Sequence, residues 1–269
     1  MHTDAQDHIP GGNVESGHGS SLALTRDFAR QLAEYLEFGG DPVRAGSNIQ
    51  AFADQHGDAS VPALIDGLSD FDLSNILRQY DLTFTSPIQQ AVSPERFAAL
   101  VEMEHKYAAG DYAELRGMLT GVLFAESGEP SDDRAVECLD AVVGQPHAVE
   151  LLAGMLLKHA EHGILNFWLY GSFLVAGTNP DNDLWLSDCL NGYAPPDIDA
   201  VRNRSARSMN GYSHSDFASE DADTRSGMAD GDLQQLCWYL REYHEDFFLD
   251  VVLHILRDMA RHHVQSGGA

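Results

Sequence analysis

The chain has 269 residues, 43% of them hydrophobic, and its 42 acidic and 16 basic side chains give a formal net charge of −26. This length allows one large helical domain or two small ones. So acidic a chain has no basic surface for a nucleic-acid backbone and would be repelled by an anionic membrane, which leaves basic proteins, metal ions and neutral small molecules as partners.

Arginine far outnumbers lysine among the basic residues: the chain has fourteen arginines and two lysines, Lys106 and Lys158. An acidic surface that is poor in lysine suits a protein working in high salt, where its charges are screened and hydrated. A GC-rich genome would give the same preference for arginine without physical meaning. A halophilic protein is therefore one of two interpretations of this composition.

Three cysteines, Cys138, Cys189 and Cys237, are widely spaced and form no CxxC motif. Their odd number and spacing indicate buried thiols in a reducing compartment, so we expect a cytoplasmic protein. The N-terminus lacks a basic segment followed by an apolar core, so no signal peptide is expected. The longest apolar stretches are interrupted by charged or His residues and are too short to cross a membrane.

The first elements in chain order are short. Residues 1–21 are rich in Gly, Ser, His and Asp and predict a disordered N-terminal lead, in which His2, His8 and His18 would capture metal only adventitiously. Helices are then expected from a cap at Thr25 to Gly39, from Pro42 to Gly57, over 63–68, and from Asp70 or Asp72 to Tyr80. Residues 82–85 could form one extended strand.

The middle of the chain predicts longer helices. Ser93-Pro94-Glu95 is a strong helix start, and this helix should run to about Ala109. Further helices are expected after Asp111, Pro130 and Pro146, and an aromatic segment follows over 164–175. The links between these helices are short, which favours antiparallel neighbours.

The last part of the chain holds a short helix after Asn179-Pro180, a long polar loop over 192–231, and a long helix over 232–263. The sequence therefore predicts an all-α protein, an irregular multi-helix bundle with a long C-terminal helix in its core. We expect a single helical domain over 22–265, with an internal boundary near 86–93 as the alternative.

The last helix carries the most conspicuous polar pair. Eight of the ten residues over 247–256 are apolar, and the exceptions, Asp250 and His254, stand one helical turn apart. A carboxylate beside an imidazole can orient it for metal binding or proton transfer. The alternative, which we favour, is that the pair is a buried hydrogen-bonded contact that fixes helix packing.

Two other segments contain potential metal ligands. Glu102 and His105 have the Glu-x-x-His spacing that helical di-iron and di-manganese proteins use, although solvated charge is the interpretation that we favour for this motif alone. Glu150, Glu161 and His162 form a reserve set on the helix that follows Pro146, where a His near the helix end is also explained by the carbonyls there.

Together these residues supply carboxylates and His from three or four helices, as a di-metal carboxylate bundle requires. The last pair is spaced by four residues, which departs from the ferritin-like pattern. In ligand types alone the set distantly resembles that of heme-oxygenase-like di-metal oxidases. No continuous segment carries this resemblance, so it transfers no residue roles.

Two functions remain open, and the sequence does not decide whether the protein is an enzyme. The first is a soluble acidic helical interaction protein, an adaptor, chaperone-like or regulatory binder, with a basic protein partner. The alternative is a metal-dependent helical oxidoreductase that binds iron or manganese through Glu102, His105, Asp250 and His254. Phosphate-binding loops, dinucleotide fingerprints, GxSxG and HExxH motifs are all absent from the sequence.

Overall fold

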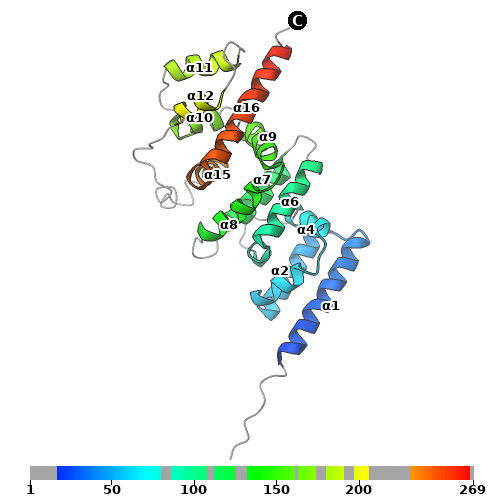
Figure 1. Ribbon diagram of the computed structural model, residues 1–269. Helices are drawn as coiled ribbons and strands as arrows, with labels where there is room; N and C mark the ends of the chain where they lie inside the picture. Colours follow the sequence, from blue (N-terminus) through cyan, green and yellow to red (C-terminus); the bar gives the residue numbers. More distant parts are fainter. Residues whose placement is uncertain are drawn as a thin grey trace, which may run out of the picture. The chain divides into compact units, whose positions relative to one another are not determined.

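Every regular element that the computed structural model describes is a helix, which confirms the predicted all-α multi-helix bundle (Figure 1). The chain divides into two compact units, Met1–Tyr80 and Asp81–Ala269. A single domain over 22–265 stays a prediction. The described residues are 17–79, 86–107, 112–124, 132–160, 163–173, 180–190, 197–205 and 231–266. Among them, no helix combines the length and the apolar character needed to cross a membrane.

The first unit consists of helices whose ends follow local sequence signals. Asp41 accepts a hydrogen bond from the Val43 N–H at 3.0 Å and starts the second helix, while Gly39 and Gly57, both with positive φ, end the first two. Ser69, one residue before the predicted cap, caps the last helix through the Asp72 N–H. The elements are α1 (Gly17–Glu37), α2 (Pro42–His56), η1 (Asp58–Ser60), α3 (Val61–Ile65) and α4 (Asp70–Gln79).

The expected cap at Thr25 is wrong, because α1 begins earlier and buries Thr25 within its length. The core of this unit lies where α1 packs on α3 and α2 packs on α4. Its fully buried side chains are aliphatic, which is the interior that amphipathic helices build from one apolar stripe each. They are Ile49, Val61, Leu64, Ile65, Leu73, Ile76 and Leu77.

The second unit is a larger helical bundle. Its closest helix pairs are α6 with α8 and α9 with α16. The long C-terminal helix α16 buries Phe248, Val251, Val252 and Ile255 completely, as expected for a helix in the core. The helices are α5 (Pro87–Ala91), α6 (Pro94–Tyr107), α7 (Ala113–Leu123), α8 (Asp132–Val143), α9 (Ala148–Ala160), α10 (Gly163–Tyr170), α11 (Pro180–Leu190), α12 (Ile198–Arg204), α15 (Gly231–Tyr243) and α16 (Glu245–Ser266).

The prediction of one continuous helix over 232–263 is wrong, because the chain turns at His244 and α15 packs against α16 (Figure 1). Residues 242–246 have exposed or half-buried side chains, so the apolar periodicity is interrupted there. Glu245 and Asp246 favour a new helix N-terminus at this point. The His244 ring lies 3.0 Å from an Asp140 carboxylate oxygen, without the geometry of a hydrogen bond.

Two short helices were not predicted. Ser86 and Gln89 form a capping box that starts α5, a five-residue helix too short to show periodicity. Helix α12 lies inside the expected polar loop over 192–231, where Asp197 caps it through the Ala200 N–H at 2.7 Å. Only Val201 is buried on α12, which explains why no apolar pattern revealed it.

Arg241 holds three segments of the second unit together. From α15 it donates to the Phe167 carbonyl at 3.2 Å and to the Ser205 hydroxyl at 2.8 Å. Its guanidinium also lies 5.7 Å from the centroids of the Phe167 and Trp168 rings. Burial lowers the pKa of Arg241, and these hydrogen bonds and ring contacts offset part of the cost of burying its charge.

We predict that Arg241→Ala lowers the free energy of unfolding of the second unit by about 2–3 kcal/mol, because it removes charged hydrogen bonds and leaves acceptors without a donor. All three tryptophans, Trp168, Trp185 and Trp238, lie in this unit, so tryptophan fluorescence during urea unfolding reports on it. Arg261→Ala in α16 is the control, since its exposed ion pair with Asp258 lies in the same unit and should leave the midpoint nearly unchanged. An unchanged midpoint for Arg241→Ala would contradict the role of Arg241.

The three cysteines are free and buried, and burial raises the pKa of the Cys237 thiol well above its ordinary value of 9.0. Above that pH the unfolded chain loses the thiol proton while the folded chain keeps it, so the unfolded state binds fewer protons and stability falls. We therefore predict that stability declines as pH rises through 9.0 and that Cys237→Ala reduces this decline. Urea unfolding of wild type and Cys237→Ala at pH values below and above 9.0 measures this decline in stability. An equal decline in the two proteins would show that Cys237 does not contribute.

Candidate functional site

The structure does not place Asp250 and His254 in one buried pair. Asp250 is exposed, and the His254 ring instead lies 3.2 Å from the Asp258 carboxylate, one turn further along α16. Asp258 also pairs with Arg261 at 3.0 Å. These polar groups therefore lie along one side of α16, outside the buried arc formed by Phe248, Val251, Val252 and Ile255.

Glu102 and His105 do lie together, and the residue that joins them is His147. The Glu102 carboxylate accepts hydrogen bonds from the His147 backbone N–H at 3.3 Å and from the Nδ1 of its ring. The His105 and His147 rings stack, with centroids 4.0 Å apart and planes 11° apart. Two imidazoles and a carboxylate thus form a small cluster, which we call the Glu102–His105–His147 cluster.

Local structure explains how this cluster arises. Glu102 and His105 are one turn apart on α6, and His147 directly precedes α9, whose first intrahelical bond runs from the Leu151 N–H to the His147 carbonyl at 2.9 Å. The Glu102 carboxylate therefore lies at the positive end of α9, where an anion is favoured. His147 was missed by sequence reasoning, because its only signal is its place before a helix start, 45 residues from Glu102.

The remaining candidate ligands do not join this cluster. Glu150 is exposed in the first turn of α9, and Glu161 and His162 lie outside the described residues. Within the described ranges, no group of three or more His, Cys, Asp or Glu side chains is arranged to hold a metal ion. The cluster as it stands therefore offers at most two imidazole ligands.

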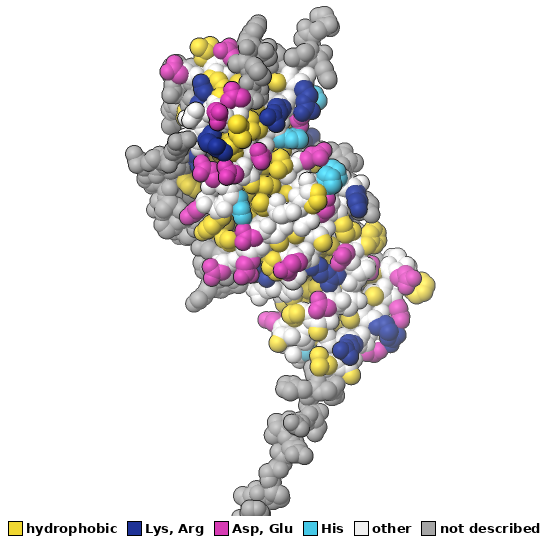
Figure 2. All heavy atoms as spheres, in the orientation of Figure 1, with side chains coloured by type: hydrophobic (Ala, Val, Ile, Leu, Met, Phe, Trp, Pro, Cys, Tyr) yellow, Lys and Arg dark blue, Asp and Glu magenta, His cyan; other side chains and the backbone are white. Residues whose placement is uncertain are grey.

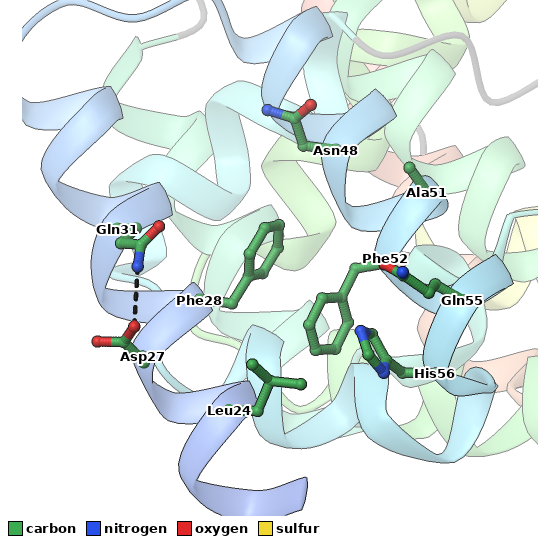
Figure 3. A pocket seen from close by; sticks show the side chains of 9 residues that line it. All are labelled: Leu24, Asp27, Phe28, Gln31, Asn48, Ala51, Phe52, Gln55 and His56. Carbon is green, nitrogen blue, oxygen red and sulfur yellow. Dashed lines mark hydrogen bonds between the residues drawn. The ribbon is translucent and has the colours of Figure 1, made fainter.

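A second feature lies in the first unit, where a groove of about 450 Å³ runs between α1 and α2 (Figure 3). Phe28 and Phe52 stack in it with centroids 4.5 Å apart, and Leu24, 47% exposed, continues this apolar floor. We call this feature the α1–α2 groove. Its walls are polar, formed by Asp27, Gln31, Asn48, Gln55 and His56, with Ala51 beside them.

The groove walls are held by local contacts. Gln31 donates to Asp27 at 2.8 Å, the bond drawn in Figure 3, and Arg30 pairs with both Asp27 and Glu34. The His56 ring lies 4.5 Å from the Phe52 ring, centroid to centroid. The groove combines an apolar floor with a polar rim, as ligand-binding and peptide-binding sites do.

We predict that Glu102→Ala lowers the free energy of unfolding by about 1–2 kcal/mol, because the His147 backbone N–H at the start of α9 loses its acceptor. Asp250→Ala, which removes an exposed carboxylate from the same unit, should change it by less than about 0.5 kcal/mol. Urea unfolding followed by tryptophan fluorescence measures both. Equal effects of the two substitutions would contradict the assigned positions.

Comparison of the chain with models of protein families, with curated proteins and with solved structures gave no match. The α1–α2 groove and the Glu102–His105–His147 cluster are therefore interpreted from their own geometry and charge.

Proposed function

We propose that the protein is a helical interaction protein that binds a basic, amphipathic helical segment of a partner protein in the α1–α2 groove. The observation that carries this proposal is the partly exposed apolar floor of the groove. A helix laid into such a groove anchors itself with apolar side chains at spacings of three, four and seven residues.

The floor has enough apolar surface to anchor a segment. Leu24 is 47% exposed, and Phe28, one turn further along α1, is half-buried. Covering one such side chain with apolar atoms contributes up to about 1.5–3 kcal/mol. A few anchors of this kind are sufficient for a specific complex when a polar rim surrounds them.

The charge of the chain supports a basic partner. Acidic side chains are spread over the visible face in Figure 2 and are more frequent than Lys and Arg, in keeping with the net charge of −26. A field of this sign accelerates the approach of a basic segment and disfavours an acidic one, and both effects weaken as salt rises. On the rim itself, Arg30 is already paired with Asp27 and Glu34, so its charge is compensated locally.

We predict that a fluorescently labelled helical peptide, with leucines on one face and Lys and Arg on the other, binds the full chain and binds more weakly as salt rises. Leu24→Asp should weaken binding by roughly tenfold or more, because an apolar anchor contact of about 1.5–3 kcal/mol is lost. Fluorescence anisotropy at two salt concentrations provides the measurement.

Leu184→Asp is the matched control, because Leu184 is a leucine of the second unit that is 63% exposed and should leave binding unchanged. A peptide of the same composition with its leucines scattered around the helix controls for charge alone. If the scattered peptide binds equally well, or if both leucine variants lose affinity alike, the proposal is wrong. Far-UV circular dichroism confirms that each variant is folded.

A further inference from the structure

Among the described residues that line the α1–α2 groove, Asp27 is the only acidic one, and it is already paired within α1. Arg30 donates to its Oδ1 at 2.5 Å and Gln31 donates to its Oδ2 at 2.8 Å, so each oxygen already has a donor from the same helix. The hydrogen bond from Arg30 lowers the pKa of Asp27, which keeps the carboxylate charged and compensated. A cation of the partner would have to compete with Arg30 for this group.

The two helices that form the groove are also close to neutral. Together α1 and α2 carry four acidic residues and three arginines, a formal charge of −1, whereas the whole chain carries −26. The acids are Asp27, Glu34, Glu37 and Asp54, and the arginines are Arg26, Arg30 and Arg44. The negative field that attracts a basic partner therefore arises almost entirely outside the groove.

Most of the remaining lining makes contacts that salt screens little. Gln31, Asn48 and Gln55 present amides, which donate and accept hydrogen bonds without net charge. Phe28 and Phe52 stack between these walls (Figure 3). Apolar burial depends far less on ionic strength than contacts between exposed charges do. An exposed ion pair changes an equilibrium constant by at most about fivefold, whereas covering one leucine changes it by roughly tenfold or more.

We infer that charge and contact play separate parts when a basic helical segment binds the groove: the acidity of the chain sets how fast the complex forms, and the apolar anchors set how long it lasts. This separation rests on the proposed function of the groove and specifies the partner further. The partner's apolar side chains are selected by Leu24 and Phe28, while its Lys and Arg need no fixed partners in the groove. It is therefore a helix with one apolar face and an excess of basic residues, without a fixed pattern of charges.

Stopped-flow fluorescence of the full chain with the labelled amphipathic peptide measures the association and dissociation rate constants at low and at high salt. We expect the association rate constant to fall by about tenfold or more as salt rises, because long-range steering is screened. The dissociation rate constant should stay within about twofold, because the groove contacts carry little net charge. A second peptide, with its Lys and Arg moved from the polar face to the two ends, should dissociate at the same rate.

Two substitutions in α1 separate contact from charge. Leu24→Ala should raise the dissociation rate constant by roughly three- to tenfold, because it removes apolar contact without adding a charge. Asp27→Asn should behave like Asp250→Asn, the matched control, which removes an exposed carboxylate of the second unit. Both should slow association slightly, and neither should speed dissociation. Far-UV circular dichroism confirms that each variant is folded.

The outcomes distinguish this inference from the proposed function. Dissociation that becomes faster with salt, or that becomes faster in Asp27→Asn but not in Asp250→Asn, would overturn the inference and leave the groove as the binding site. A peptide that does not bind, or that leaves wild type and Leu24→Ala at the same rate, would contradict the proposed function and the inference with it.

Discussion

The need to keep a large number of carboxylates in water constrains this protein more than any single contact. The chain carries 42 acidic side chains, and among the residues that the structure describes Glu104 is the only one of them that is fully buried. Burying an unpaired carboxylate costs several kcal/mol, so each helix can contribute only its apolar stripe to the interior. Amphipathic helices packed stripe to stripe satisfy this constraint, and the acids remain on the outside.

The same constraint shapes both candidate sites. The first unit spans only 80 residues, and a unit of this size leaves part of its apolar surface uncovered, here at Leu24 and Phe28 between α1 and α2. In the second unit, the partly enclosed carboxylate of Glu102 is compensated by the positive end of α9 and by His147. One site thus presents uncovered apolar surface within an acidic molecule, and the other an oriented imidazole.

Local signals in the sequence predicted much of the fold. Caps, proline and glycine act within a few residues, and they set the helix bounds at Pro42 and Gly57 and the helix start at Ser93. The Ser93 hydroxyl accepts a hydrogen bond from the Arg96 N–H at 3.3 Å, as expected for a cap. The turn at His244 was missed, because the apolar positions Leu240 and Phe247, seven residues apart, continue one helical face across it. Only the packing of α15 against α16 shows that the chain turns there.

The candidate sites were less predictable than the helices. Glu102 and His105 were predicted from their spacing, but their partner His147 lies 45 residues from Glu102, and no local pattern links helix α6 to the start of α9. Asp250 and His254 were predicted as a pair. One carboxylate stands four residues before His254 and another four residues after it, so spacing alone does not choose between them. In the structure His254 contacts the later one, Asp258. The α1–α2 groove depends on which apolar residues remain uncovered, which periodicity does not specify.

We propose above that the α1–α2 groove binds a basic helical segment of a partner protein. Hydrogen exchange of the full chain, followed by mass spectrometry with and without the basic amphipathic peptide, tests it most directly. We expect slower exchange on peptide addition in α1 and α2, with α6, α9 and α16 unchanged. Protection spread evenly over the acidic helices of both units, or confined to the second unit, would contradict a groove-based interaction and would indicate charge-driven association alone.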